Sequence, residues 1–141
     1  MAVSALEGGF AEPVFAAQAS FRAVMDALAQ PGTNRLMTAV TNPPPPLSPT
    51  AAALALTLCD FDTPVWLDRP LRHDPAIAQW IGVQTGAETV GEPAQSAFAF
   101  IADAAAMPPL TDFAQGTQEY PDRSTTIVIQ LNALTGGDRL T

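Results

Sequence analysis

Residues 48–67 read SPTAAALALTLCDFDTPVWL, and this stretch predicts a helix, a turn and a strand in succession. Ser48 is a favoured N-cap residue, and Pro49 suits the first helical position because its missing N–H would have no helical partner there. The helix that follows, through Cys59, is apolar on nearly all sides, so we expect it to be buried on more than one face. The stretch therefore favours an α/β protein with this helix in its interior.

The turn at Asp60–Asp62 leads into a short predicted strand, Thr63–Leu67. Pro31-Gly32 ends an earlier helix, whose apolar stripe follows the i, i+3, i+4, i+7 spacing and consists of Phe21, Val24, Met25 and Leu28. A third helix begins at Asp74-Pro75, ends at Gly82 or Gly86, and carries Ile77, Trp80 and Ile81. The other predicted strands are Arg35–Val40, Glu88–Val90, Ala97–Ile101 and Thr125–Leu131.

The order of these elements predicts the fold class. Strands and helices alternate along the chain, and several strands are apolar on both faces. This pattern is typical of a sheet that helices cover on both sides. It does not decide between a parallel and a mixed sheet.

Length and composition limit the partners. The chain has 141 residues, which fits a single domain over 1–141. Its net charge is −8 and its six arginines are dispersed, whereas nucleic acids and anionic membranes require clustered basic side chains. We therefore exclude both as direct partners. Charged residues make up only 14% of the chain, which indicates that another chain covers part of the surface, and the acidic balance favours a basic partner protein.

The expected location is the cytoplasm. The single cysteine, Cys59, cannot form an internal disulfide, which fits a reducing compartment. The first ten residues lack the basic and apolar regions of a signal peptide. The longest apolar run, Ala51–Cys59, is far shorter than the ~20 residues that a membrane helix needs.

The chain offers few residues for catalysis. It contains no lysine, which excludes Schiff-base chemistry, a pyridoxal phosphate anchor and a P-loop lysine. We interpret His73 as a surface residue, with a general base as the alternative, and Cys59 as buried and inert, with a Cys59–His73 nucleophile pair as the alternative. The sequence therefore predicts no catalytic residues, cofactor or metal site, and a chain that is not catalytic alone.

Asp60 and Asp62 are the remaining candidates for chemistry. Paired carboxylates can bind a divalent cation or act as acid and base, but aspartates at such a position more often hydrogen-bond the backbone two residues on. We interpret the pair as turn-forming. Trp66 and Trp80 are predicted core residues, and Gly136-Gly137 is a predicted hairpin turn.

Several segments resemble one bacterial family, PhnH, a component of the phosphonate carbon–phosphorus lyase complex. The residues that carry the resemblance are Pro13-Val14, Gln18, Ser20-Phe21-Arg22, Met25, Leu28, Pro31-Gly32, Leu56–Leu67, Thr85-Gly86-Ala87, Pro93, Ala97 and Leu134–Gly137. The segment 56–67 is the most specific of them. Family members continue well past the glycine pair, so the chain is identified as a PhnH-like domain without the family's C-terminal part.

The resemblance implies a three-layer α/β/α sandwich with a mixed sheet, similar to the pyridoxal-phosphate-dependent transferases but without the cofactor. It also implies assembly with subunits G, I and J and allows a homodimer. In that complex the I component, together with the G, H and L components, transfers phosphonate to the ribose of a nucleoside triphosphate. The J component, a radical enzyme with an iron–sulfur cluster and S-adenosylmethionine, then breaks the carbon–phosphorus bond.

The chain would thus be a non-catalytic accessory subunit in phosphonate utilisation. The residues expected to touch a partner or to hold the docking surface are Asp60, Asp62, Thr63 and Trp66. Two alternatives stay open. One is a small-molecule binding module that holds a nucleotide or a phosphonate in the cleft where the similar transferases hold pyridoxal phosphate. The other is an enzyme with a carboxylate or Cys–His site.

Overall fold

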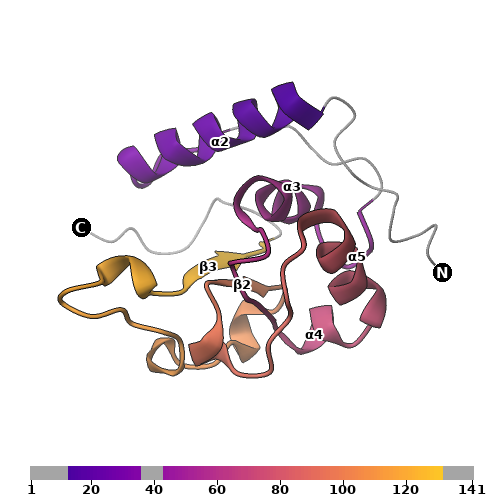
Figure 1. The fold of residues 1–141 in the computed structure, drawn as a ribbon, viewed down its shortest axis with the longest axis vertical. Coiled ribbons are helices and arrows are strands. Elements are labelled where there is room, and N and C mark those ends of the chain that lie inside the picture. Colours follow the sequence, from indigo (N-terminus) through magenta and orange to yellow (C-terminus); the bar gives the residue numbers. More distant parts are fainter. Residues whose placement is uncertain (1–12, 36–42, 132–141) are drawn as a thin grey trace.

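A computed structural model describes residues 13–35 and 43–131. The helices are α2 (Pro13–Ala29), α3 (Pro49–Leu58), α4 (Arg69–Arg72) and α5 (Pro75–Thr85), and the strands are β1 (Val65–Leu67), β2 (Phe98–Ile101) and β3 (Thr126–Ile129). Short 3₁₀ turns occupy Pro93–Gln95, Ala104–Ala106, Leu110–Asp112 and Pro121–Arg123. Figure 1 shows α3 and α5 lying against the sheet, with α2 as an outer helix beyond α3. The predicted strand Arg35–Val40 and the turn Gly136-Gly137 fall outside the described residues, apart from Arg35, which is not in a strand.

The described strands form one parallel sheet in the order β1-β2-β3. Val65 pairs with Phe98, and Ala99 pairs with Ile127. The predicted strand Glu88–Val90 is reduced to a parallel bridge on the outer edge of β1, where the Val65 N–H donates to Glu88 O at 2.8 Å. The mixed sheet that the resemblance implied is therefore not seen in this part of the chain, because all three strands run the same way.

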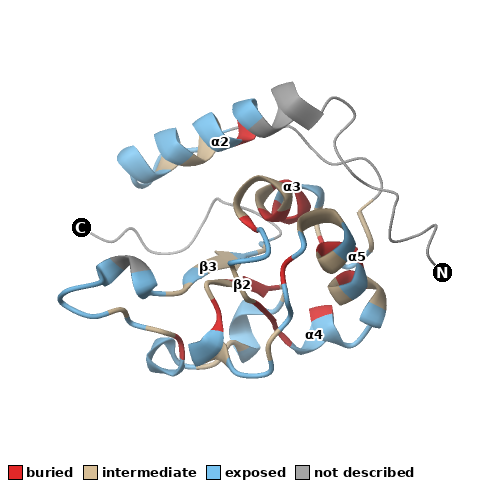
Figure 2. Cartoon of the chain, viewed as in Figure 1, coloured by how far each residue is buried: buried red, intermediate tan, exposed pale blue. Residues whose placement is uncertain are grey.

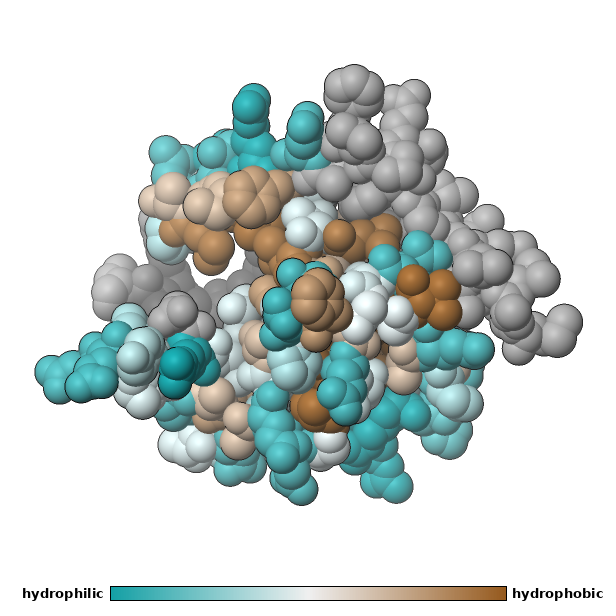
Figure 3. All heavy atoms as spheres, viewed as in Figure 1, coloured by the Kyte–Doolittle hydropathy of each residue, from teal (hydrophilic) through white to brown (hydrophobic). Residues whose placement is uncertain are grey.

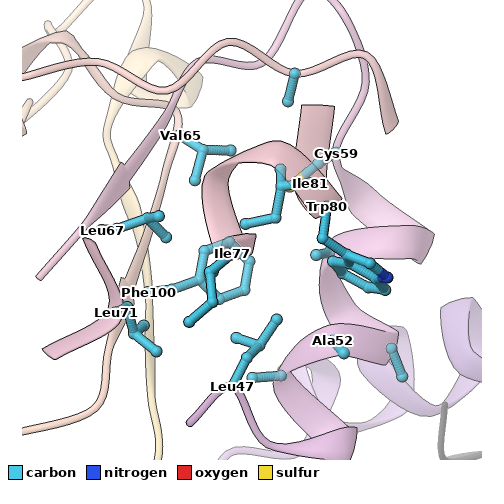
Figure 4. Packing of buried hydrophobic residues seen from close by; sticks show 14 residues of the cluster. Leu47, Ala52, Cys59, Val65, Leu67, Leu71, Ile77, Trp80, Ile81 and Phe100 are labelled. Carbon is cyan, nitrogen blue, oxygen red and sulfur yellow. The ribbon is translucent and has the colours of Figure 1, made fainter. Parts of the chain in front are cut away.

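The two faces of the sheet are covered differently. On one face, side chains of β1 and β2 meet α3, α4 and α5 in a cluster that includes Val65, Leu67, Phe100, Leu71, Ile77, Trp80 and Ile81 (Figure 4). On the other face, Trp66 and Ile101 pack with Phe113, which comes from a loop. The expectation of helices on both faces is thus met on one face only, since loops and 3₁₀ turns close the other within 43–131.

The helix boundaries follow local signals that the sequence contains. The Ser48 hydroxyl accepts the Ala51 N–H at 3.1 Å, and the Asp74 carboxylate accepts the Ala76 N–H at 2.9 Å, so both predicted N-caps are confirmed. α5 ends at Gly86, whose φ of 80° lies in the left-handed region that favours glycine. Of the two predicted ends, Gly86 is therefore the observed one.

The predicted apolar stripe of α2 is only partly covered. Phe21, Met25 and Leu28 are 51%, 49% and 67% exposed, whereas Val24 is half-buried. Figure 2 shows much of the α2 ribbon in pale blue, and Ser20 is the one buried residue among residues 18–29 of this helix. Amphipathic spacing identifies an apolar stripe on a helix, but it does not show which neighbour covers that stripe.

Gln130 connects the end of β3 to the start of α3. Its side-chain oxygen accepts the Ser48 N–H at 2.8 Å, and its side-chain nitrogen donates to Pro46 O at 3.1 Å. These two bonds fix the entry to α3 at the carboxyl end of the last described strand.

Candidate functional site

The turn before β1 is held by its own polar groups. The Asp60 N–H donates to Thr63 Oγ1 at 2.7 Å, the Thr63 N–H donates to Asp60 O at 3.1 Å, and the Asp62 N–H donates to Asp60 Oδ1 at 2.8 Å. These bonds confirm the turn-forming interpretation for Asp60, whose carboxylate accepts the N–H two residues on. They also mean that Asp60 and Thr63 fix the shape of the turn, while the Asp62 carboxylate is exposed.

Phe61 is the most exposed large apolar side chain in the described part of the protein, at 78%. Sequence reasoning did not single it out, although an aromatic residue between two turn-forming aspartates was a usable signal. A Cβ placed on Gly86 would lie 3.5 Å from Phe61 Cβ, so the turn rests on the end of α5. The result is a fixed turn that presents an aromatic ring beside the carboxylates of Asp60 and Asp62.

Trp66 does not belong to this exposed turn. It is 5% exposed, and its ring meets Phe113 edge-to-face with a centroid distance of 5.7 Å and an interplanar angle of 84°. The Arg72 guanidinium carbon lies 6.0 Å from the Trp66 ring centroid. The predicted set is therefore divided: Asp60 and Asp62 lie on the surface, Thr63 is half-buried, and Trp66 is in the core.

The position of the turn also bears on its chemistry. It precedes β1, so it lies at the amino ends of the parallel strands. In open α/β sheets, ligands bind outside the carboxyl ends of the strands. The location of Asp60 and Asp62 thus favours a contact surface over a site for a small ligand.

Cys59 and His73 do not form a nucleophile pair. Cys59 is buried, and this burial raises the pKa of its thiol from 9.0 to about 12; a hydrogen bond with Thr63 lowers it and the charge of Asp60 raises it further. His73 is exposed at the end of α4, where its backbone N–H donates to Arg69 O at 3.0 Å. Because the thiol is buried and the imidazole is exposed, the structure gives no support to the Cys59–His73 version of the enzyme alternative.

No group of three or more His, Cys, Asp and Glu side chains comes together as a metal site within residues 13–35 and 43–131. None of the helices in these two ranges has both the length and the apolar character that crossing a membrane requires.

Sequence reasoning also missed Asp68, at the carboxyl end of β1. This residue is 4% exposed and caps α4; its Oδ2 accepts the N–H groups of Ala102 at 2.9 Å and Asp103 at 3.0 Å. The available signal was Asp68 followed by Pro70, the same kind of pattern that identified Asp74. Asp68 joins the ends of β1 and β2, and its polar contacts give it a structural role.

The pKa of Cys59 predicts a loss of stability at high pH. Between pH 9 and 12 the unfolded thiol loses its proton while the folded thiol keeps it, so the unfolded state binds fewer protons and stability falls as pH rises. We expect the free energy of unfolding to fall by about 2 kcal/mol more in the parent chain than in Cys59→Ala between pH 8 and pH 10.5. Urea unfolding of both proteins measures this difference, and equal losses would contradict a buried, neutral thiol.

Two comparisons place the chain among known proteins. The model of a family described as "Bacterial phosphonate metabolism protein (PhnH)" matches residues 8–141. Over 133 residues, the chain is 48% identical to alpha-D-ribose 1-methylphosphonate 5-triphosphate synthase subunit PhnH of Rhizobium meliloti (strain 1021). The alignment covers 94% of this chain and 66% of that relative, so the chain spans just under two thirds of the relative's length.

Proposed function

Because the chain belongs to the PhnH family of bacterial phosphonate metabolism proteins, we propose that it is a non-catalytic accessory subunit of the carbon–phosphorus lyase complex. In this role it supports the transfer of a phosphonate to the ribose of a nucleoside triphosphate. The observation that carries the proposal is the family match over 8–141, together with the relative whose name describes it as a subunit of a ribose methylphosphonate triphosphate synthase. The cytoplasm, expected from the composition, is the proposed location.

The side-chain inventory supports an accessory role. The chain has no lysine, and burial keeps its only thiol protonated at neutral pH. The polar groups of Asp60 and Thr63 hold a turn, and those of Asp68 cap α4 and join two strand ends. Four candidate side chains for chemistry, those of Cys59, Asp60, Thr63 and Asp68, thus serve the structure of the protein.

The proposed fold of the complete protein is a three-layer α/β/α sandwich with a mixed sheet, similar to the pyridoxal-phosphate-dependent transferases. The parallel sheet with helices on one face supports this proposal. The second helical layer and an antiparallel strand would come from parts of the protein other than the described residues. A lysine-free chain of this fold has no residue to form the cofactor's aldimine.

The proposed partners are subunits G, I and J, and the proposed docking surface is the turn before β1. Asp60 and Asp62 would contact the partner there, with the exposed Phe61 ring between them. Thr63 would hold the turn through its bonds to Asp60, and Trp66 would support it from the core side of β1. Both aspartates are exposed, so their negative charges can face a basic partner surface. A homodimer of this chain is a further proposed assembly.

A charge-removal experiment tests this surface. The double variant Asp60→Asn, Asp62→Asn removes two negative charges, while the amide oxygen at position 60 can still accept the N–H of residue 62. We expect it to weaken association with co-expressed subunits G, I and J about tenfold or more at low salt, because complementary charges speed the encounter of the two surfaces. Co-purification at increasing salt concentrations, followed by size exclusion, measures the effect.

The matched control is Asp112→Asn, which removes an exposed charge from a 3₁₀ turn elsewhere in the chain. It should co-purify like the parent chain. If the parent chain assembles with the other subunits and the double variant assembles equally well, the docking surface lies elsewhere. If the full-length family member assembles and the parent chain 1–141 does not, the accessory role of this chain is contradicted.

A further inference from the structure

α2 packs against the protein in an unusual orientation. It contacts α3, and its buried or half-buried residues with described side chains are mostly small: Ser20, Ala23, Val24 and Ala27. Its larger apolar side chains, Phe21, Met25 and Leu28, lie at i, i+4 and i+7 on the exposed side. A surface helix of a globular protein normally buries its large apolar residues and exposes polar ones. This arrangement suits a helix that packs against α3 through its small residues and against a second neighbour through its large apolar ones.

A hollow adjoins this exposed stripe. Its volume is about 730 Å³, and its described lining residues are Gln18, Phe21, Arg22 and Met25. Figure 3 shows brown, hydrophobic atoms along α2 above an opening that separates this helix from the body of the protein. A contiguous apolar surface beside a hollow of this size has room for side chains from another segment.

Among residues 13–35 and 43–131, no strand pairs with the outer edge of the sheet. β3 is the last strand in the sheet order, and Ile129 and Leu131 are 39% and 57% exposed. A groove of about 260 Å³ runs between the start of α3, including Leu54, and residues 128–131. α3 therefore lies between two uncovered features, the stripe on α2 and the edge of β3.

We propose that the apolar stripe of α2 is the docking face for an apolar protein segment equivalent to the third of the Rhizobium meliloti relative that has no counterpart in this chain. The observation that selects this occupant is the relative's length, because 48% identity over 133 residues gives the two proteins the same structure in the shared part. A relative with the same helix, about a third of whose length is unmatched here, has the material to cover the stripe.

The test compares one substitution in two backgrounds. The first background is the chain 1–141. The second is a chimaera in which the relative's unmatched third is added to this chain at the position it has in the relative. Leu28→Ser should shift the Tm of the chain 1–141 by less than about 2 °C, because the side chain is 67% exposed there. In the chimaera the same change should lower the Tm by about 5 °C or more, because it removes a buried apolar contact.

Val83→Ser is the matched control, since Val83 is 49% exposed on α5 and lies outside the stripe. It should shift the Tm equally in both backgrounds. Equal effects of Leu28→Ser in the two backgrounds would overturn the proposal. So would a chain 1–141 that sediments as a dimer and becomes a monomer on Leu28→Ser, because the occupant would then be a second copy. If the chimaera does not fold, the test moves to the relative. The substitutions at the positions aligned with Leu28 and Val83 are then compared in the full-length relative and in the relative without its unmatched third.

Discussion

Trp80→Ala will lower the free energy of unfolding by about 3–5 kcal/mol, as expected when a large side chain is removed from a packed core. The Trp80 side chain is fully buried on α5 and faces α3, where Figure 4 labels Ala52 beside it. α3 buries a run of small residues at this contact, Ala51, Ala52, Ala53 and Ala55. Because alanines leave space that the indole fills, its loss creates a cavity that these small side chains cannot close.

Urea unfolding followed by circular dichroism measures this effect. Val83→Ala on the exposed part of the same helix is the control, and it should change the free energy of unfolding by less than about 0.5 kcal/mol. A loss below about 1.5 kcal/mol for Trp80→Ala would show that the contact between α3 and α5 is not tightly packed.

Asp68→Ala is expected to cost about 3 kcal/mol. The substitution removes a buried carboxylate and leaves the partly buried N–H groups of Ala102 and Asp103 without their acceptor, which costs free energy of folding. It also removes the cap of α4, whose Leu71 N–H points to Asp68 Oδ1 at 3.4 Å. Both losses act where β1 and β2 end, so we expect local loosening there as well as lower global stability.

Two controls separate these contributions. Asp68→Asn keeps one oxygen that can accept the pair of N–H groups, so it should retain more than half of the stability that Asp68→Ala loses. Asp103→Ala removes only an exposed cap, whose carboxylate accepts the Ala105 N–H at 3.2 Å, and should cost about 1 kcal/mol or less. Chemical denaturation of the three variants ranks them. If Asp68→Ala and Asp103→Ala were equally stable, the buried carboxylate would have no special role.

The sequence predicted those parts of the fold that depend on neighbouring residues. Ser48-Pro49 and Asp74-Pro75 are local N-cap signals, and the β-branched residues of 125–131 form a local strand signal. The turn at Asp60–Asp62 was also predicted, because the aspartate bonds its own backbone two residues on. The helix α4 was not expected, since four residues are too few for a periodic pattern.

Features that depend on distant residues could not be read from the pattern. Nothing local to Phe21 or Leu28 shows whether a neighbour covers the apolar stripe of α2, so the exposure of these two side chains could not be predicted from the sequence. Whether two strands pair in parallel or antiparallel depends on both segments, and the apolar pattern of a single strand is compatible with either direction. The separation of Trp66 from Asp60 and Asp62 could not be predicted for the same reason, because it depends on the distant residue Phe113, which covers the sheet face that carries Trp66.

The hydrogen bonds of Gln130 also set an order of events in time. They join residues that are 82 and 84 positions apart, so the entry to α3 acquires its partner only after nearly all of residues 1–131 have been synthesised. Contacts between residues so far apart in sequence form late, because closing the intervening loop must come first. On the ribosome, α3 can therefore pack against α2 and α5 as these helices emerge, whereas the chain entering it at Pro46 and Ser48 stays without its Gln130 partner until the end of β3 has been made.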